Sequence, residues 1–405
     1  MRQQTSSAAR KKKQGGPKLS KRLTSTWSSC VLKRARLRNM DSASSDDDKM
    51  RALLTQEFRN IERLWEVFTQ ERDDLTRYLG DPKKQLVSYL LGFHLPNVAR
   101  TSQIIDRWSY RIPVGFWKSL AEWNVSLTDI GCGTGALSSA FIDFMTRKKC
   151  QPKSLNIALL DKQKAFLDVA SELIGGIEPG HINSIQTHKG DLDSLLAKGL
   201  PGASNQSEPT LHIELLGYVW NELNKHKKAQ KQLFRRLETL QDKHSILVIL
   251  EPANQNLSRA CMELREELLA MGYLASYPCS ASGPCPMLER SKDWCYSELA
   301  WERPKIIERL DKKLGVDHSK LSTTAMIFIS PKAAESFRIK PSEKATVVGR
   351  PLNRKPSVKT PRSPNKGFSY LLCIGETLEK ITAKEITTPK TPSTTRLRGE
   401  QLSGK

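Results

Sequence analysis

The sequence predicts an α/β fold, in which a doubly wound parallel sheet follows a helical domain, carries a cysteine-rich insertion and precedes a small β-rich segment. Three observations in the 405 residues predict this. Short apolar runs alternate with helical patterns, a glycine-rich loop follows the first apolar run, and three cysteines fall within 17 residues near the end of the alternating region. Such alternation is typical of a sheet with helices on both faces.

Seven apolar runs have the length of buried strands. They are 125–130, 155–160, 182–187, 211–216, 245–250, 273–277 and 323–330. Helical patterns separate the first six, at 136–147, 163–174, 222–240 and 256–271. Together they define a predicted sheet domain over 119–330, with an insertion over 278–322 before the last run.

A helical domain is predicted over 50–118. Apolar residues recur there at steps of three and four, which places them on one helix face; they are Leu54, Phe58, Ile61, Trp65 and Phe68. The first helix is expected over 50–80. Two more are expected over 84–92 and 98–108, with a break at His94-Leu95-Pro96-Asn97. After the sheet domain, a basic β-rich segment is predicted over 331–386, with strand-like pieces at 345–348 and 368–373.

The formal net charge of +22 is concentrated at the two ends of the chain. Residues 1–40 hold 12 Lys and Arg with no Asp or Glu, and 331–405 hold 16 basic and 6 acidic residues. The part between them is neutral, with 37 of each sign. A neutral body with basic ends predicts a polyanionic partner, most simply nucleic acid, with solubilising tails as the alternative.

The two ends are also poor in apolar residues. Residues 1–49 and 387–405 are rich in Ser, Thr, Lys and Arg, so both are expected to be disordered tails. The lack of acidic residues in 1–40 would also suit a mitochondrial transit peptide. No run approaches the roughly 18 apolar residues of a membrane-spanning helix, so no membrane span is expected.

The glycine loop is the most informative motif. It reads Asp129-Ile130-Gly131-Cys132-Gly133-Thr134-Gly135 and joins the first predicted strand to the first predicted helix. Its glycine spacing would also satisfy a dinucleotide fingerprint. The carboxylate of Asp129 would oppose a pyrophosphate, however, and it suits the ammonium and sulfonium charges of S-adenosylmethionine.

Two later acids extend this cofactor site. Asp161 ends the second predicted strand, where an acid binds ribose hydroxyls, and Asp191 follows the third strand, within reach of an adenine amino group. The predicted cofactor-binding residues are therefore Asp129, Gly131, Gly133, Gly135, Asp161 and Asp191. The fourth strand leads into Trp220-Asn221-Glu222, which lacks the Asn/Asp-Pro-Pro-aromatic signature of amino-group methylation. Asn221 and Glu222 are read as helix-capping residues, and no catalytic residue is assigned.

The cysteines of the insertion predict a metal site. Cys279, Cys285 and Cys295 have the spacing C-x5-C-x9-C, and Cys373 follows after 77 residues. Structural zinc usually takes two close pairs of cysteines, whereas separated thiolates beside Gly-Pro and Cys-Pro turns suit a cubane iron–sulfur cluster. Zinc and ordinary buried thiols stay open as alternatives.

These motifs together resemble a known family. They are Tyr89 with Leu95-Pro96-Asn97, the glycine loop, Asn221-Glu222-Leu223, Glu251-Pro252, and Pro278-Cys279 to Pro286 with Asp293-Trp294-Cys295. Over about 50–380 the chain resembles the methyltransferase-like proteins of the mitochondrial small ribosomal subunit and their bacterial relatives. The resemblance implies a Rossmann-like class I methyltransferase sheet and a 4Fe-4S cluster, whose ligands by position would be Cys279, Cys285, Cys295 and Cys373.

The resemblance also implies a role in small-subunit assembly or translation. The first hypothesis is an S-adenosylmethionine-dependent methyltransferase acting on rRNA. The second is a non-catalytic RNA-binding assembly factor on the same fold. The expected partner is the small ribosomal subunit, with the protein monomeric outside it. The expected location is the cytoplasm if the chain is bacterial, or the mitochondrial matrix with 1–40 as transit peptide.

Overall fold

The computed structural model describes most of the chain. The described residues are 17–35, 44–69, 82–178, 180–197, 209–341, 346–348, 368–374 and 376–383. The predicted tail 387–405 and residues 1–16 lie outside them. In the described part, no helix has the length and apolar character needed to cross a membrane.

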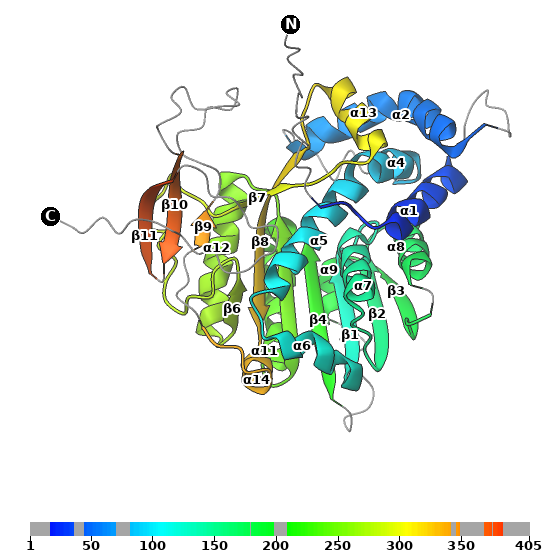
Figure 1. Cartoon of the computed structure of the whole chain (residues 1–405). Helices are drawn as coiled ribbons and strands as arrows, with labels where there is room; N and C mark the ends of the chain where they lie inside the picture. The colour runs from blue at the N-terminus through cyan, green and yellow to red at the C-terminus, as the bar shows by residue number, and fades with distance from the viewer. Residues whose placement is uncertain are drawn as a thin grey trace, which may run out of the picture.

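The core of the molecule is one mixed sheet (Figure 1). Its strands run in the order β3-β2-β1-β4-β5-β8-β6, and a short β7 pairs with one end of β8. Their bounds are β1 Asn124–Ile130, β2 Ser154–Asp161, β3 Ser184–Lys189, β4 Thr210–Gly217, β5 His244–Glu251, β6 Leu274–Tyr277, β7 Ser297–Ala300 and β8 Lys320–Ile329. This is the Rossmann-like fold of class I methyltransferases.

The prediction of a purely parallel sheet is wrong for one strand. β1 to β5 are parallel, but β8 lies antiparallel between β5 and β6. A parallel strand needs a crossover back to the edge where its predecessor began. The segment between β6 and β8 stays instead at the carboxyl edge, the edge where the parallel strands end, so the chain re-enters the sheet from there.

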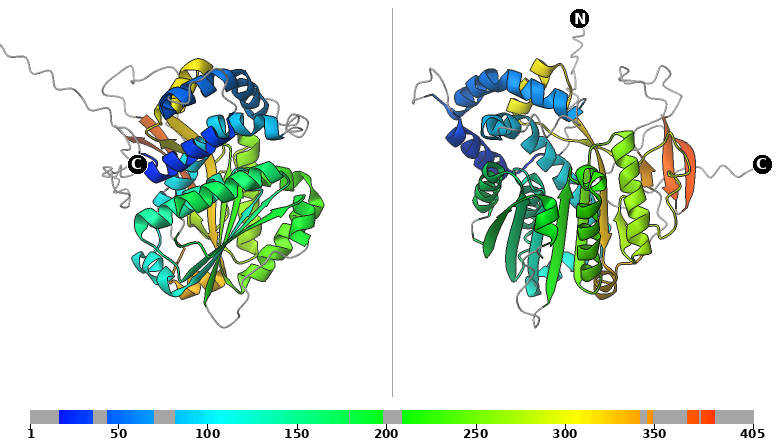
Figure 2. Two further views of the ribbon diagram at one scale, coloured as in Figure 1. Left: turned by 90° about the vertical axis from the view of Figure 1, so that its right-hand side faces the viewer. Right: turned by 180° about the vertical axis from the view of Figure 1, so that it is seen from behind.

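Helices cover both faces of the sheet (Figure 2). On one face lie α5 (Leu95–Ser109), α7 (Ala136–Lys148) and α8 (Lys164–Ile177). The other face carries α9 (Leu192–Ala197), α10 (Trp220–Lys225), α11 (Lys227–Gln241) and α12 (Gln255–Ala270). These helices confirm the predicted alternation, except that the single helix expected over 222–240 is divided at His226.

The N-terminal helices lie across the carboxyl edge of the sheet (Figure 1). They are α2 (Asp46–Thr69) and α4 (Pro82–Tyr89), which continues through a π-helical turn, η2 (Leu90–His94), directly into α5. The expected break before Pro96 is absent. Pro96 occupies the first turn of α5, where the π turn before it accommodates the missing N–H. Helix α6 (Val114–Ser119) and η3 (Leu120–Glu122) then lead into β1.

A further helix, α1 (Lys21–Arg34), lies within the predicted N-terminal tail. The expectation of disorder over 1–49 is wrong for this part, and also for the start of α2 at Asp46. The segment is polar overall, yet its apolar residues share one helix face that packs on the body. These buried residues are Leu23, Trp27, Cys30 and Val31. The Trp27 indole N–H donates to the Leu90 carbonyl at 3.0 Å.

The C-terminal part adds a small antiparallel sheet beside α12 (Figure 1). After α13 (Lys305–Leu314) in the insertion and α14 (Pro331–Ser336), the strands run in the order β11-β10-β9. They span Thr346–Val348, Phe368–Ile374 and Thr377–Ala383 for β9, β10 and β11. The first two match the strand-like pieces read from the sequence, whereas β11 was not expected.

The first testable prediction concerns α1. Trp27→Ala should lower the free energy of unfolding by about 3–5 kcal/mol, because it empties a buried site and removes an indole hydrogen bond. The exposed Ser29→Ala should change it by less than about 0.5 kcal/mol. Urea unfolding measures both. Deleting 1–16 should leave the midpoint unchanged and deleting 1–35 should lower it; equal midpoints for the two deletions would show that α1 adds nothing to the fold.

Candidate functional site

The glycine loop connects β1 to α7 at the carboxyl edge of the sheet. Gly131, Gly133 and Gly135 have φ values of +67°, +53° and +71°, a left-handed conformation that side chains with a Cβ rarely adopt. Space is also limiting at Gly131, where a Cβ would lie 2.4 Å from a methyl group of Val219. The glycines are therefore required by the path of the backbone and by the packing on it.

Asp129 lies at the end of β1 and is 1% exposed. Its carboxylate accepts hydrogen bonds from the Ser138 backbone N–H at 3.3 Å and from the Ser138 hydroxyl at 2.6 Å. Burial raises the pKa of Asp129 to about 7, with the Ser138 hydrogen bonds opposing that rise. The carboxylate thus holds the first turn of α7, and its contact with a cofactor stays a prediction.

Asp161 lies at the end of β2 and faces the glycine loop. Its carboxylate accepts from the backbone N–H groups of Gly133 at 2.9 Å and Gln163 at 2.8 Å, and burial raises its pKa. Asp191 is different, because its side chain is exposed at the start of α9. Its neighbour Gly190 donates to the Asp161 carbonyl at 3.2 Å, which keeps the turn after β3 beside β2. The structure therefore brings the loop and Asp161 together and leaves Asp191 at the margin.

Two side chains of the N-terminal helices reach this loop, the half-buried Tyr89 and the buried His94. The Tyr89 hydroxyl lies 3.8 Å from the position that a Cβ on Gly133 would take, and burial raises its pKa. Its ring stacks on Phe93 at 5.4 Å and meets Phe166 of α8 edge-on at 5.2 Å. His94 Nδ1 is 2.9 Å from the hydroxyl of Thr134 in the loop.

His94 is neutral at physiological pH, since burial lowers its pKa to about 3. The two cavities described in this structure, beside the cysteines and beside Cys150, both lie away from the glycine loop. Among the described residues, Tyr89 is the one whose side chain comes within 4 Å of a Cβ built on Gly133. Sequence reasoning noted Tyr89 only as part of the family resemblance, because its contact with the loop is a long-range one.

The turn after β4 faces the same edge. Tyr218 has φ +65°, a conformation that is uncommon for a residue with a side chain and that concentrates at functional sites. Trp220 opens α10 and is buried, with its indole N–H donating to the Ala260 carbonyl at 3.2 Å. Glu222 lies in the first turn of α10, where a negative charge suits the helix dipole. The N-cap residue of α10 is Val219, and no side chain caps the helix there, so Asn221 does not have the expected capping role.

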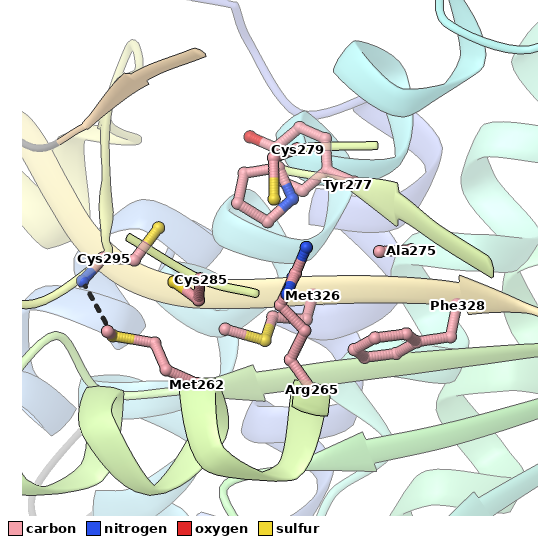
Figure 3. A pocket seen from close by; sticks show the side chains of 10 residues that line it. Met262, Arg265, Ala275, Tyr277, Cys279, Cys285, Cys295, Met326 and Phe328 are labelled. Carbon is pink, nitrogen blue, oxygen red and sulfur yellow. Dashed lines mark hydrogen bonds between the residues drawn. The ribbon is translucent and has the colours of Figure 1, made fainter. Parts of the chain in front are cut away.

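The four predicted metal-binding cysteines gather at one place, although Cys373 is far in the sequence from the other three. Cys279, Cys285 and Cys295 line a cavity of about 20 Å³ beside α12 (Figure 3). Cys373, on β10, is buried in the apolar cluster against which Cys285 and Cys295 pack. Burial, and then repulsion by Cys285 and Cys279, raise the pKa of the Cys373 thiol to about 12. The four sulfurs are therefore close enough to influence one another.

Two arginines of α12 hold the loop that carries these cysteines. The Arg265 guanidinium donates to the carbonyls of Ala281 at 2.8 Å and Gly283 at 3.1 Å. The Arg259 guanidinium donates to four carbonyls farther along the loop, at 3.0 to 3.4 Å; they belong to Met287, Leu288, Arg290 and Asp293. The loop is therefore ordered by protein hydrogen bonds.

The cysteine loop also contacts the C-terminal sheet. Glu376, in the turn between β10 and β11, lies so close to Gly283 that a Cβ there would be 1.9 Å from its carboxylate. Among the described residues, no three His, Cys, Asp or Glu side chains are already arranged to hold a metal ion. Two buried donors beside the cysteines, Arg265 Nε and Trp294 Nε1, have no hydrogen-bond partner in the described structure. The assignment of four metal ligands stays a prediction.

The second testable prediction follows from the burial of Asp129. Its folded-state pKa of about 7 exceeds the ordinary value of 3.8, so the folded protein keeps a proton that the unfolded chain loses. This stabilisation is complete below the unfolded pKa and is lost as the pH rises through 7. Relative to Asp129→Asn, the wild-type unfolding free energy should fall by about 3 kcal/mol between pH 5 and 8. Urea unfolding across this range measures it; parallel pH profiles of the two proteins would contradict the prediction.

Comparison with known structures finds methyltransferases. A putative class I S-adenosylmethionine-dependent methyltransferase from Listeria monocytogenes matches at 12% identity and a TM-score of 0.36, covering 85% of this chain and 92% of that one. YcgJ from Bacillus subtilis matches at 16% identity and a TM-score of 0.28, covering 53% and 96%. A methyltransferase from Aquifex aeolicus matches at 13% identity and a TM-score of 0.25, covering 44% of this chain and 89% of that one. No curated protein matches the chain.

One protein family does match. The family described as mitochondrial small ribosomal subunit Rsm22 covers residues 120–360, more than half of the chain. The matched region contains the glycine loop, the whole sheet and three of the four gathered cysteines. The chain belongs to the Rsm22 family, on a class I methyltransferase fold.

Proposed function

We propose that this protein binds the rRNA of the small ribosomal subunit as an assembly factor, with an S-adenosylmethionine site that its own side chains keep closed. The observation that carries this proposal is the position of Tyr89 over Gly133. A glycine loop that a tyrosine side chain covers at Gly133 serves more readily as part of a binding platform than as the cofactor site of an enzyme in its resting state. Family membership supports the partner, and the basic ends of the chain support the nucleic-acid component.

Methyl transfer to rRNA is the second candidate, and a specific observation favours it. The three loop glycines have a left-handed conformation and the Asp161 carboxylate accepts a hydrogen bond from Gly133 of the loop, which supports the ribose-binding role that we propose for Asp161. Transfer of a methyl group to a nucleophile needs chiefly positioning and an in-line approach. The absence of an assigned base therefore does not decide between the two candidates.

The location of the protein is a proposal of the same kind. The family name indicates a mitochondrial ribosome, which would require import of the chain. Helix α1 argues against removal of residues 1–40 as one leader, because that would take away the buried Trp27 and Leu23. We infer that any leader that is removed ends before Lys21.

The gathered cysteines support an iron–sulfur cluster bound by Cys279, Cys285, Cys295 and Cys373. When bound, such a cluster supplies either a structural link between the sheet domain and the C-terminal strands or a redox centre. In a cubane cluster each cysteine thiolate binds a different iron atom. The cysteine sulfurs of a cluster are therefore farther from one another than the cysteine sulfurs that bind a single zinc ion. Thiols that surround one cavity without converging on a point fit that arrangement. The unpartnered Arg265 Nε and Trp294 Nε1 fit as donors to cluster sulfur.

The experiment that tests the proposal combines two measurements on purified small subunits. Binding of the protein is followed by sedimentation, and methyl transfer by incorporation from labelled S-adenosylmethionine. Binding without incorporation supports the assembly factor, and incorporation into rRNA supports the second candidate. If the protein binds neither the subunit nor its isolated rRNA, both candidate functions are contradicted.

The third testable prediction concerns Tyr89. Tyr89→Ala should bind S-adenosylmethionine at least tenfold more tightly than the wild type, because it removes the ring that fills the site. Phe93→Ala is the matched control: Phe93 stacks on Tyr89 in the same aromatic cluster, but it is not among the atoms within 4 Å of a Cβ built on Gly133. The affinity of this variant should stay near the wild-type value. Isothermal calorimetry measures all three. Loss of binding in Tyr89→Ala alone would mean that Tyr89 contacts the cofactor instead of excluding it.

The fourth testable prediction concerns the metal. Protein purified without oxygen should contain about four iron atoms and as much sulfide per chain, and Cys285→Ser should lose both. Cys150→Ser, a buried thiol at the end of α7, is the control and should keep them. Metal analysis and the visible absorption spectrum report the result. One zinc per chain would replace the cluster by a zinc site, and unchanged iron in Cys373→Ser would remove Cys373 from the ligand set.

A further inference from the structure

Helix α11 has an apolar inner face and a basic outer face. Its buried residues are Ala229, Leu233, Leu237 and Leu240. Its outer face carries four exposed basic side chains, Lys227, Lys228, Lys231 and Arg235. We call these four the α11 basic face. Steps of four residues separate Lys227, Lys231 and Arg235, so the charges follow one another every ~6 Å along the helix axis.

The charges of this face are not neutralised by the fold. None of the four side chains makes an ion pair with a described residue, and α11 has no acidic residue in its first turn. Some exposed basic side chains elsewhere on the body are paired within their own helix, as Arg51 is with Asp47 and Asp48, and Lys164 with Asp168. The α11 basic face is therefore an unbalanced surface within the neutral region 41–330.

The position of the first three lysines is also unfavourable for the helix itself. Lys227, Lys228 and Lys231 lie in the first turns of α11, where the helix dipole disfavours positive charge. This cost is largest for Lys227 and Lys228, because the effect of the dipole falls off after the first turn. A negatively charged partner on the same surface would offset this cost, because it would be attracted both by the lysines and by the helix end.

The face lies close to the candidate methyl-acceptor side of the sheet. α10 begins at Trp220, three residues after the end of β4. A single residue, His226, then separates α10 from α11. β4 is paired directly with β1, which ends in the glycine loop. A strand of nucleic acid bound along α11 would therefore run toward the carboxyl edge of the sheet, where the cofactor site lies.

We propose that the α11 basic face binds the phosphate backbone of small-subunit rRNA and leads it to the carboxyl edge of the sheet. The proposal rests on the proposed function, since it names the surface by which the body of the protein holds that RNA. A row of exposed, unpaired Lys and Arg matches a phosphate backbone in charge, and it requires no particular base sequence.

The test uses the full-length protein and isolated small-subunit rRNA. In the triple variant Lys228→Gln, Lys231→Gln, Arg235→Gln, the affinity should fall tenfold or more. The slope of log K against log salt should become shallower by about 2 to 3, because three phosphate contacts are lost. Glutamine keeps a good helix propensity, so α11 should persist, and an unchanged melting temperature checks this.

The control carries the same change of charge on other helices, at the edge of the sheet where the parallel strands begin. Lys118, Lys332 and Lys340 are exposed and lie on α6, on α14 and just after it (Figure 1). Their triple Gln variant should keep the wild-type salt slope. Equal slopes for the two variants would overturn the proposal and assign binding to the basic ends.

Two further outcomes are distinct from these. If the α11 variant binds isolated rRNA normally but binds whole subunits poorly, the face contacts a ribosomal protein, and the RNA assignment is overturned. If the wild-type protein binds neither subunits nor rRNA, the proposed function fails first, and the α11 proposal fails with it.

Discussion

The contact between the helix from Pro82 to Ser109 and the glycine loop holds the N-terminal helices on the sheet. Two of its side chains reach the loop, with Tyr89 over Gly133 and His94 beside Thr134. His94 is buried and Tyr89 is half-buried against Phe93 and Phe166, so moving this helix away would expose part of an aromatic cluster and separate His94 from Thr134. The π turn between them is the irregular point of an otherwise continuous helix, and such turns recur at functional sites. On the proposed function, a cofactor bound at the glycine loop would have to displace Tyr89 from Gly133.

The cysteine loop depends on a different constraint. Arg259 and Arg265 of α12 fix its path through hydrogen bonds to loop carbonyls. The proposed metal would in addition join this loop to β10 through Cys373. Arg265 is buried and donates to two carbonyls, so it is costly to leave unpaired. These hydrogen bonds hold the cysteine loop on α12.

Much of the sheet domain could be predicted from the sequence, and the reason is local. β5, for example, contains a continuous apolar run from Ile246 to Leu250, and the spacing of Gly131 and Gly133 predicts the turn of the glycine loop. The direction of β8 could not be predicted, because it depends on the edge from which the chain returns. α1 was missed because average composition hides four apolar residues on one face. The contact of Tyr89 with the glycine loop and the hydrogen bonds of Arg265 to the cysteine loop join residues far apart in the sequence. In the sequence, Tyr89 resembles an ordinary core tyrosine and Arg265 resembles a surface charge.

Hydrogen exchange of the amides of Leu90–His94, with and without saturating S-adenosylmethionine, tests the closed site most directly. If the cofactor must displace Tyr89, the turn that carries it has to loosen, and exchange there should become faster while the β1 amides stay protected. Slower or unchanged exchange in the presence of bound cofactor would contradict the account, since it would mean that the ligand fits over the loop with Tyr89 in place.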